Sequence, residues 1–335
     1  MFSTINQINQ NYFRDKETFN TSKVSFKGSN LQNNPGLALK VLNKDTFQKS
    51  NVQAFTGNSD PVAGSDFLAK DDYIYKLFFN TPSKVNIPGV SDKFMVYHNI
   101  YTVGDVNLLL VPKDTGCRSL YQTEQKYNEE LHKSMNSLIT FLKKMYPDRN
   151  IYFAEHGSGS VKGNKQDKNG RSVEIAHGHF IIAPEAKEPS LNTFITALNS
   201  KLKQCNWQNI DKKSMKYEGL IPDKDVFKAI SDKLGIKFKS EPPYLLIGKV
   251  DKSSKKQEGF MILKTSESDK TPSQLIRIVM AELFYGSDSP EFWDWKKLMD
   301  CHNNGNTSQF TPRLNDIRKA NEDFWERYNK TINNL

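Results

Sequence analysis

One long helical pattern, from about residue 123 to 146, restricts the fold more than any other feature of the sequence. Its apolar residues recur every three or four positions, and Pro147 ends the pattern. Segments on both sides of it have the length and composition of strands, namely 94–98, 106–113, 150–157 and 173–184. Because these strands and helices do not alternate regularly, we expect an α+β fold: an antiparallel sheet with the long helix across it.

The carboxyl-terminal part predicts further helices and a hairpin. Helical spacing follows Ser190 and Asp223, whose residue types often cap the amino-terminal end of a helix. A third helix is predicted with Thr271 as its cap, Pro272 at its first position and Gln274 completing a capping box. Two strand patterns with a basic turn between them indicate a hairpin: 244–250 and 259–264.

These signals divide the chain into four parts. Residues 1–35 are rich in polar side chains and predict a poorly ordered tail. Residues 36–93 form an amino-terminal extension whose structure the sequence does not determine. Residues 94–190 are predicted to form the core of the fold, and residues 191–335 an α+β extension of helices and a hairpin that packs against it.

Composition and charge restrict the class of protein. Hydrophobic residues make up 37% of the chain, which is typical of a globular protein, and the net charge is +9. A basic chain favours anionic partners such as nucleotides or nucleic acid, although its lysines are scattered. No signal peptide and no apolar run of about 18 residues is visible. We therefore expect a cytoplasmic protein without a membrane partner.

Two histidines on the strand at 173–184 are the strongest candidates for chemistry. His177 and His179 are two positions apart, so their side chains share one face of the strand together with Ile181. Three interpretations fit this pattern: a nucleophile with a neighbouring helper, a metal pair, or two structural histidines. A zinc site would need more ligands, for which Glu155, His156 and Cys117 are the candidates.

The nucleophile interpretation has a clear chemical basis. A neutral imidazole attacks phosphorus, and the resulting phosphoramidate is resolved by water or another acceptor. Gly178 would let a ligand approach the backbone closely. The polar loop that contains Gly157, Ser158 and Gly159 would direct backbone N–H groups at phosphate oxygens.

The order of several motifs resembles the HIT (histidine triad) superfamily, and specifically its bacterial HIT-like branch with a carboxyl-terminal extension. The similar segments span roughly 94–300 and read LLLVPK (108–113), FAEHGSGS (153–160), HGHFIIAP (177–184), PPYLLIG (242–248), SQLIRIVMAELF (273–284) and WDWK (293–296). The resemblance implies a nucleotide hydrolase or nucleotidyltransferase that acts at an α-phosphate through a nucleotidyl-histidine intermediate. It implies no resident metal, although Mg²⁺ could arrive with the substrate, and it makes a homodimer one expected assembly.

Residue roles follow from the same resemblance. His179 occupies the position of the nucleophile, and His177 the position that orients it. Ser158 and Gly159 would approach the phosphates. Ile181 replaces the third histidine of the family signature, which puts the chemistry of the leaving group in doubt.

Five further residues belong to the predicted substrate site. Glu155, His156 and Gly157 open the glycine turn, and Lys113 follows a strand end. A fifth candidate is Arg277, which would pair either with a phosphate or with a core acid. The main alternative function is a non-catalytic nucleotide- or RNA-binding module with a degenerate HIT site. A metal hydrolase that uses His177 and His179 is a third reading.

Overall fold

The structure is a computed structural model of the 335-residue chain. It describes residues 84–99, 101–114, 117, 119–157, 176–185, 187–238, 242–266, 269, 271–272, 274–287, 289–294, 297 and 311–335. The predicted tail at 1–35, most of the amino-terminal extension, and the loop with Ser158 and Gly159 lie outside these residues. All described residues belong to one compact unit, Leu42–Leu335.

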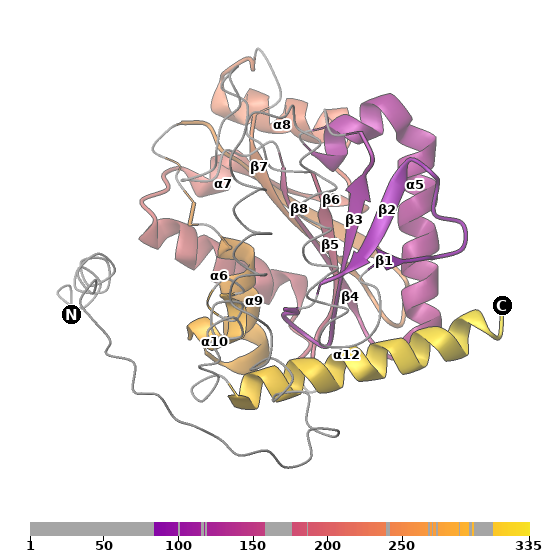
Figure 1. The fold of residues 1–335 in the computed structure, drawn as a ribbon. Helices are drawn as coiled ribbons and strands as arrows, with labels where there is room; N and C mark the ends of the chain where they lie inside the picture. Colours follow the sequence, from indigo (N-terminus) through magenta and orange to yellow (C-terminus); the bar gives the residue numbers. More distant parts are fainter. Residues whose placement is uncertain are drawn as a thin grey trace, which may run out of the picture. The chain divides into compact units, whose positions relative to one another are not determined.

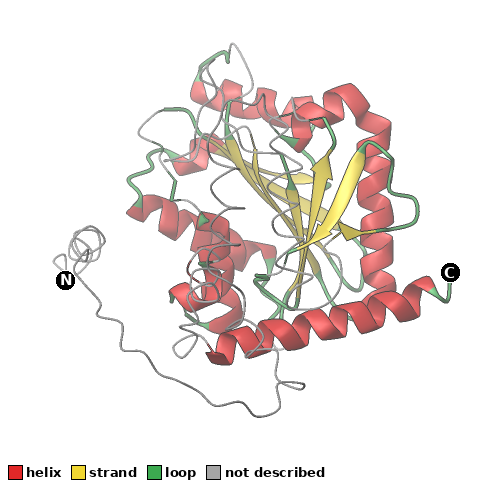
Figure 2. Cartoon of the chain, in the orientation of Figure 1, coloured by secondary structure: helices red, strands yellow, loops and turns green. Residues whose placement is uncertain are grey.

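The described strands form an eight-stranded sheet in the order β1-β2-β3-β5-β4-β7-β8-β6, and every neighbouring pair is antiparallel. Figures 1 and 2 show this sheet at the centre of the molecule. The α+β class and the antiparallel sheet are therefore confirmed. The strands are β1 (Lys84–Val85), β2 (Phe94–His98), β3 (Val106–Pro112), β4 (Ile151–Gly157), β5 (Gly178–Ile182), β6 (Ser214–Glu218), β7 (Tyr244–Val250) and β8 (Gln257–Leu263).

Strands from the two predicted parts, 94–190 and 191–335, belong to this one sheet. β4 pairs along its whole length with β7, and β7 continues into β8 through the predicted hairpin. β6, which the sequence patterns did not indicate, pairs with β8 at the edge. The strands of the carboxyl-terminal part therefore extend the sheet of the predicted core.

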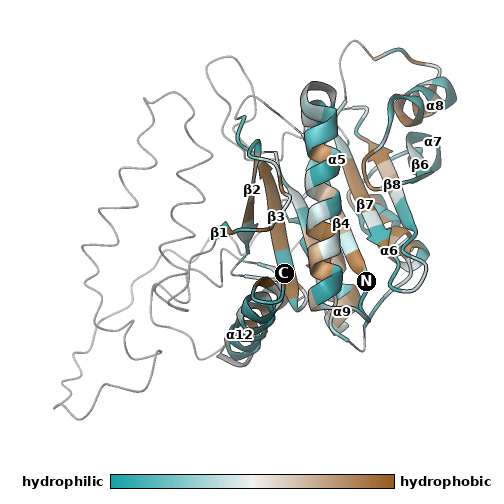
Figure 3. Cartoon of the chain, turned by 90° about the vertical axis from the view of Figure 1, so that its right-hand side faces the viewer, coloured by the Kyte–Doolittle hydropathy of each residue, from teal (hydrophilic) through white to brown (hydrophobic). Residues whose placement is uncertain are grey.

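The long helix α5 (Leu120–Met145) covers one face of the sheet, as Figures 1 and 3 show. It begins three residues before the predicted start because Ser119 caps it, its Oγ accepting a hydrogen bond from the backbone N–H of Gln122. Its apolar stripe includes Leu131, Leu138 and Leu142, which pack on the apolar residues that β3, β4 and β5 direct to this side.

Two other helices cover the opposite face: α6 (Leu191–Gln204) and α9 (Leu275–Tyr285). The predicted cap Ser190 is confirmed, because its Oγ accepts a hydrogen bond from the backbone N–H of Thr193. Short helices complete the fold: α7 (Ile210–Lys213), α8 (Lys224–Leu234) and α10 (Pro290–Trp293). In α8 the predicted cap Asp223 is confirmed, and the helix ends at Gly235, which has a left-handed backbone.

The predicted capping box at the start of α9 is wrong. The helix begins at Leu275, after Gln274 with a left-handed backbone (φ 68°) and no side-chain cap. The side chain of Gln274 instead donates a 3.4 Å hydrogen bond to Asp294. Thr271 is buried, two residues beyond Asp269, whose carboxylate binds the buried ammonium of Lys213 at 2.8 Å. Tertiary contacts on both sides of the turn therefore override the local capping signal.

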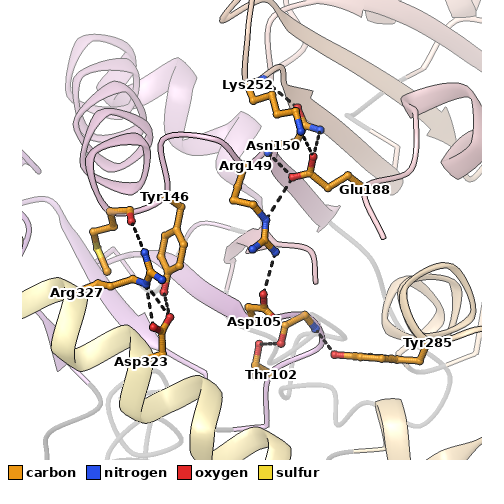
Figure 4. Close-up of polar contacts among 12 residues, drawn as sticks. Thr102, Asp105, Tyr146, Arg149, Asn150, Glu188, Lys252, Tyr285, Asp323 and Arg327 are labelled. Atoms are coloured by element: carbon orange, nitrogen blue, oxygen red, sulfur yellow. Dashed lines mark hydrogen bonds and ion pairs between the residues drawn. The ribbon is translucent and has the colours of Figure 1, made fainter. Parts of the chain in front are cut away.

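A last helix, α12 (Thr311–Ile332), crosses one end of α5 and the sheet (Figure 1). Arg327 of this helix donates to the carbonyl of Met145 and forms an ion pair with Asp323. A second polar cluster lies at the same end, where Arg149 contacts Asp105 at 2.9 Å and Glu188 at 3.5 Å (Figure 4). Polar contacts therefore hold this end of the molecule, away from His177 and His179.

The hydropathy of the helices bears on the expectation of a protein without a membrane partner. Among the described residues, no helix combines the length and the apolar character that a membrane crossing requires. In Figure 3 the apolar colour is concentrated in the strands, while the outer surface of α12 is hydrophilic.

The docking of α12 gives the first prediction. Phe324 is completely buried, and its ring stacks on His98 of β2 with 4.2 Å between the ring centroids. The change Phe324→Ala should lower the free energy of unfolding by about 3–5 kcal/mol, because it leaves a cavity. Urea denaturation measures this, with exposed Lys319→Ala as the control that stays within about 0.5 kcal/mol of the parent. Equal stabilities of the two variants would show that α12 is not part of the folded unit.

Candidate active site

Three histidines share one face of the sheet at the centre of the strand order. The β4–β5 register pairs Ala154 with His179 and Glu155 with Gly178, so its continuation places His156 opposite His177. Directly paired residues of antiparallel strands lie on the same face. The rings of His177 and His179 are 4.9 Å apart between centroids, at 68° to each other. All three side chains are partly exposed.

Asn107 of β3 orients His179. The Nδ1 of His179 lies 3.1 Å from the side-chain carbonyl Oδ1 of Asn107. Because a carbonyl oxygen only accepts hydrogen bonds, Nδ1 carries the proton in this contact and Nε2 keeps its lone pair. Asn107 is itself only 1% exposed, so neighbouring strands hold it in place. The geometry therefore presents Nε2 of His179 as a base or nucleophile.

Burial and nearby positive charge favour the neutral form of His179 and of His156. Burial lowers the pKa of His179 well below its usual value, and His177 and Arg277 lower it further. Burial also lowers the pKa of His156 to about 4, with smaller contributions from Lys264 and His177. Neutral imidazole is the form that attacks phosphorus, so the protein environment favours the reactive state over a wide pH range.

Cationic and polar donors without partners lie close to the histidines. Arg277 is 7% exposed, and its Nε and Nη2 donate to the backbone carbonyls of Trp293 (2.8 Å) and Tyr101 (2.7 Å). Its partners are thus backbone groups and not the core acid considered from the sequence. The remaining Nη1 of Arg277 and the Nδ2 of Asn107 are buried and have no hydrogen-bond partner. Such donors fit an anionic ligand.

Ile181, at the third position of the motif, belongs to the hydrophobic core. It is 1% exposed and packs in the cluster under α6 and α9, together with Val103 and Tyr152. Position 181 in this chain therefore does not line an open site. An imidazole there would be buried among apolar side chains.

Glu155 lies on the opposite face of the sheet from the histidines. Its carboxylate accepts hydrogen bonds from the backbone N–H of Leu120 (2.6 Å) and from the hydroxyl of Tyr244 (2.8 Å). Burial raises its pKa to about 7, against the lowering effect of these two donors. Both oxygens are occupied in the interior, so Glu155 holds the first turn of α5 and the structure does not bring it to the histidine face.

Gly157 and Gly178, the glycines beside the three histidines, also contribute to packing on the α5 side. A side chain at Gly157 would meet the ring of Tyr244 at 2.0 Å, and one at Gly178 would meet Phe153 at 2.5 Å and Leu120 at 2.6 Å. The expectation that Gly178 gives room to a ligand is therefore wrong, because the room is filled by the core.

The other predicted phosphate-binding residues are only partly placed. Lys113 is exposed just beyond the end of β3, and its backbone N–H donates to Lys93. Ser158 and Gly159 lie outside the described residues, so the structure does not show what they contact. Among the residues described, no group of three or more His, Cys, Asp or Glu side chains is arranged to hold a metal ion.

Neither the protein-family models nor the curated proteins contain a match to this chain. Membership in the HIT superfamily stays a prediction based on short motifs and their order.

The sequence patterns did not predict two features of the site. Asn107 sits in an apolar strand, VNLLLVP, where a lone amide is a signal of a buried polar contact, but its partner depends on which strand lies next to β3. Lys264 follows β8 and reaches the histidine face only because β7 lies between β4 and β8. The pattern of a single strand does not predict which strand lies beside it, so neither contact could be predicted.

The raised pKa of Glu155 gives a prediction for stability. A folded-state value of about 7, against an ordinary value of 4.5, means that the folded protein prefers the protonated form. This contribution is fully present below about pH 4.5 and is lost as the pH rises through 7. Relative to Glu155→Gln, the parent should lose about 3 kcal/mol of unfolding free energy from pH 4.5 to 8. Urea denaturation across this range checks it, with exposed Glu218→Gln as control; parallel pH profiles of parent and Glu155→Gln would contradict it.

A third prediction concerns Ile181. The change Ile181→His introduces the residue that the HIT signature has at this position. It should not increase turnover and should lower the unfolding free energy by more than about 2 kcal/mol, because the imidazole finds no partner in the core. The control Ile181→Val should cost only about 0.5–1.5 kcal/mol. Thermal unfolding and nucleotide release are measured together. A faster and equally stable histidine variant would show that position 181 lines the site.

Proposed function

We propose that this chain is a HIT-like protein that hydrolyses or transfers a nucleotide at its α-phosphate through a covalent intermediate on His179. An antiparallel sheet crossed by one long helix agrees with the fold that the HIT resemblance implies. The motif order in the sequence and the shared face of His177 and His179 support the same reading.

The observation that carries this proposal is the hydrogen bond from Nδ1 of His179 to Asn107. A nucleophilic histidine needs a fixed tautomer, with one nitrogen protonated and the other free to attack. In serine hydrolases a carboxylate performs this orienting role, whereas here a neutral amide does so. When Nε2 bonds to phosphorus while Nδ1 keeps its proton, the ring becomes positively charged, and Oδ1 of Asn107 stabilises that charge by accepting the hydrogen bond from Nδ1.

The charges around His179 fit a phosphate. Arg277 and Lys264 supply positive charge to the histidine face. Glu155, the acid predicted for the site, lies on the other face, so a bound phosphate does not meet its negative charge. The buried Nη1 of Arg277 and Nδ2 of Asn107 provide N–H donors for phosphate oxygens.

The reaction proceeds in two steps. The lone pair of Nε2 of His179 attacks the α-phosphorus, and the bond from phosphorus to the leaving oxygen breaks, with its electron pair remaining on that oxygen. Water or another acceptor then attacks the same phosphorus and releases its proton to solvent, and the electron pair of the N–P bond returns to Nε2. Asn107 holds the Nδ1 proton throughout both steps.

A second function is favoured by the position of Ile181. Because the third motif position is a core residue, a nucleotide- or RNA-binding module without turnover is the alternative. Such a module on a chain of net charge +9 would bind long RNA with a steep dependence on salt. A hydrolase would instead select small nucleotides.

Release of nucleoside monophosphate tests the proposal. The panel contains dinucleoside polyphosphates, nucleotide sugars and p-nitrophenyl esters of nucleoside monophosphates, with the parent, His179→Ala and Asn107→Ala compared. His179→Ala should abolish release, and Asn107→Ala should reduce it by about 10²-fold, because the tautomer is no longer fixed.

The matched control is His132→Ala, a change of an exposed histidine on α5 that is paired with Glu124. It should leave release unchanged. Absence of release by the parent across the panel, together with tight and salt-sensitive RNA binding, would support the binding module and overturn the enzymatic proposal.

A further inference from the structure

We propose that His156 is the catalytic residue that donates a hydrogen bond to the leaving oxygen, the task that Ile181 cannot perform. This inference rests on the proposed function of His179, and it assigns a role to a third histidine on a different strand.

The sheet register brings His156 to the reacting face. β4 and β5 are antiparallel neighbours, and the continuation of their pairing sets His156 directly across from His177. His179 is then its diagonal neighbour, a separation of about 7–8 Å that aromatic side chains can bridge. A phosphate in contact with Nε2 of His179 can therefore present its leaving oxygen to His156.

The surroundings of His156 leave its ring available. Glu155 and Gly157, on both sides of it in β4, are tied to the α5 layer by Leu120 and Tyr244. The ring of His156 points to the other face and is partly exposed. Within the part of the chain that the structure describes, neither of its ring nitrogens has a hydrogen-bond partner, although Lys264 and His177 act on it electrostatically.

A neutral imidazole is sufficient for this role. Burial lowers the pKa of His156, and Lys264 and His177 lower it further, so the ring N–H acts as a hydrogen-bond donor and not as a full acid. Neutral histidine is a known electrophilic donor to developing oxyanions. As the P–O bond breaks, the electron pair stays on the leaving oxygen, which departs as an anion stabilised by His156 and by the positive charge of Lys264.

This mechanism restricts the substrate class. Without a full proton donor, the leaving group must be stable as an anion. Phosphoanhydrides, whose leaving group is a phosphate, and aryl esters meet this condition better than alkyl esters or phosphoramidates do. The substrate class that fits the three histidines is therefore a nucleotide with a phosphoanhydride bond.

Two substrates that differ only in the leaving group test the inference. These are the p-nitrophenyl and the unsubstituted phenyl ester of the same nucleoside monophosphate, since phenolate is much the more basic leaving group. The change His156→Phe keeps a ring but removes the donor, and His156→Gln restores an N–H. We expect His156→Phe to slow the phenyl ester at least about tenfold more than the p-nitrophenyl ester, and His156→Gln to recover part of that difference.

The outcomes separate this inference from the proposed function. Equal losses of rate on both esters in His156→Phe, with no recovery in His156→Gln, would give His156 a structural role and overturn the inference. The proposed function would still stand in that case if release depends on His179. No release by the parent from either ester would overturn the proposed function itself. Unchanged thermal unfolding of both variants confirms that they fold.

Discussion

The alternation of side chains along the paired central strands β4 and β5 is the constraint on which this molecule depends. Their register fixes which residues meet, and each successive residue turns to the opposite face. One face receives Glu155, Gly157 and Gly178, which pack against α5 and complete its first turn. The other face receives His156, together with the histidines of the HGH motif. A shift of this register by one residue would turn the core residues to the histidine face and the histidines to the core.

The same constraint explains why polar groups are tolerated beside the core. The buried Asn107 is placed by the pairing of β3 with β5 and meets His179. The buried Arg277 closes the turn before β3 by binding the carbonyl of Tyr101 and is near enough to act on the same histidine. Each therefore has a structural bond and a free N–H, so the scaffold that holds the loop also provides donors to the site.

Local patterns in the sequence predicted much of this arrangement. The strands, the long helix, and the caps at Ser190 and Asp223 depend on neighbouring residues alone, and they are confirmed. The start of α9 was predicted wrongly because Gln274 takes a left-handed backbone set by tertiary contacts. The shared face of His177 and His179 follows from strand geometry. The positions of His156 and Asn107 beside these histidines, and of Glu155 on the opposite face, depend on the order and register of strands that are distant in the sequence.

Capture of the covalent intermediate tests the central claim most directly. The protein is mixed with a p-nitrophenyl ester of a nucleoside monophosphate, quenched in alkali, where phosphoramidates survive, and digested for mass spectrometry. The account predicts a nucleotidyl group on the peptide that contains His179, formed during turnover and lost after acid treatment. Turnover without any such adduct, or an adduct on a residue other than His179, would contradict it.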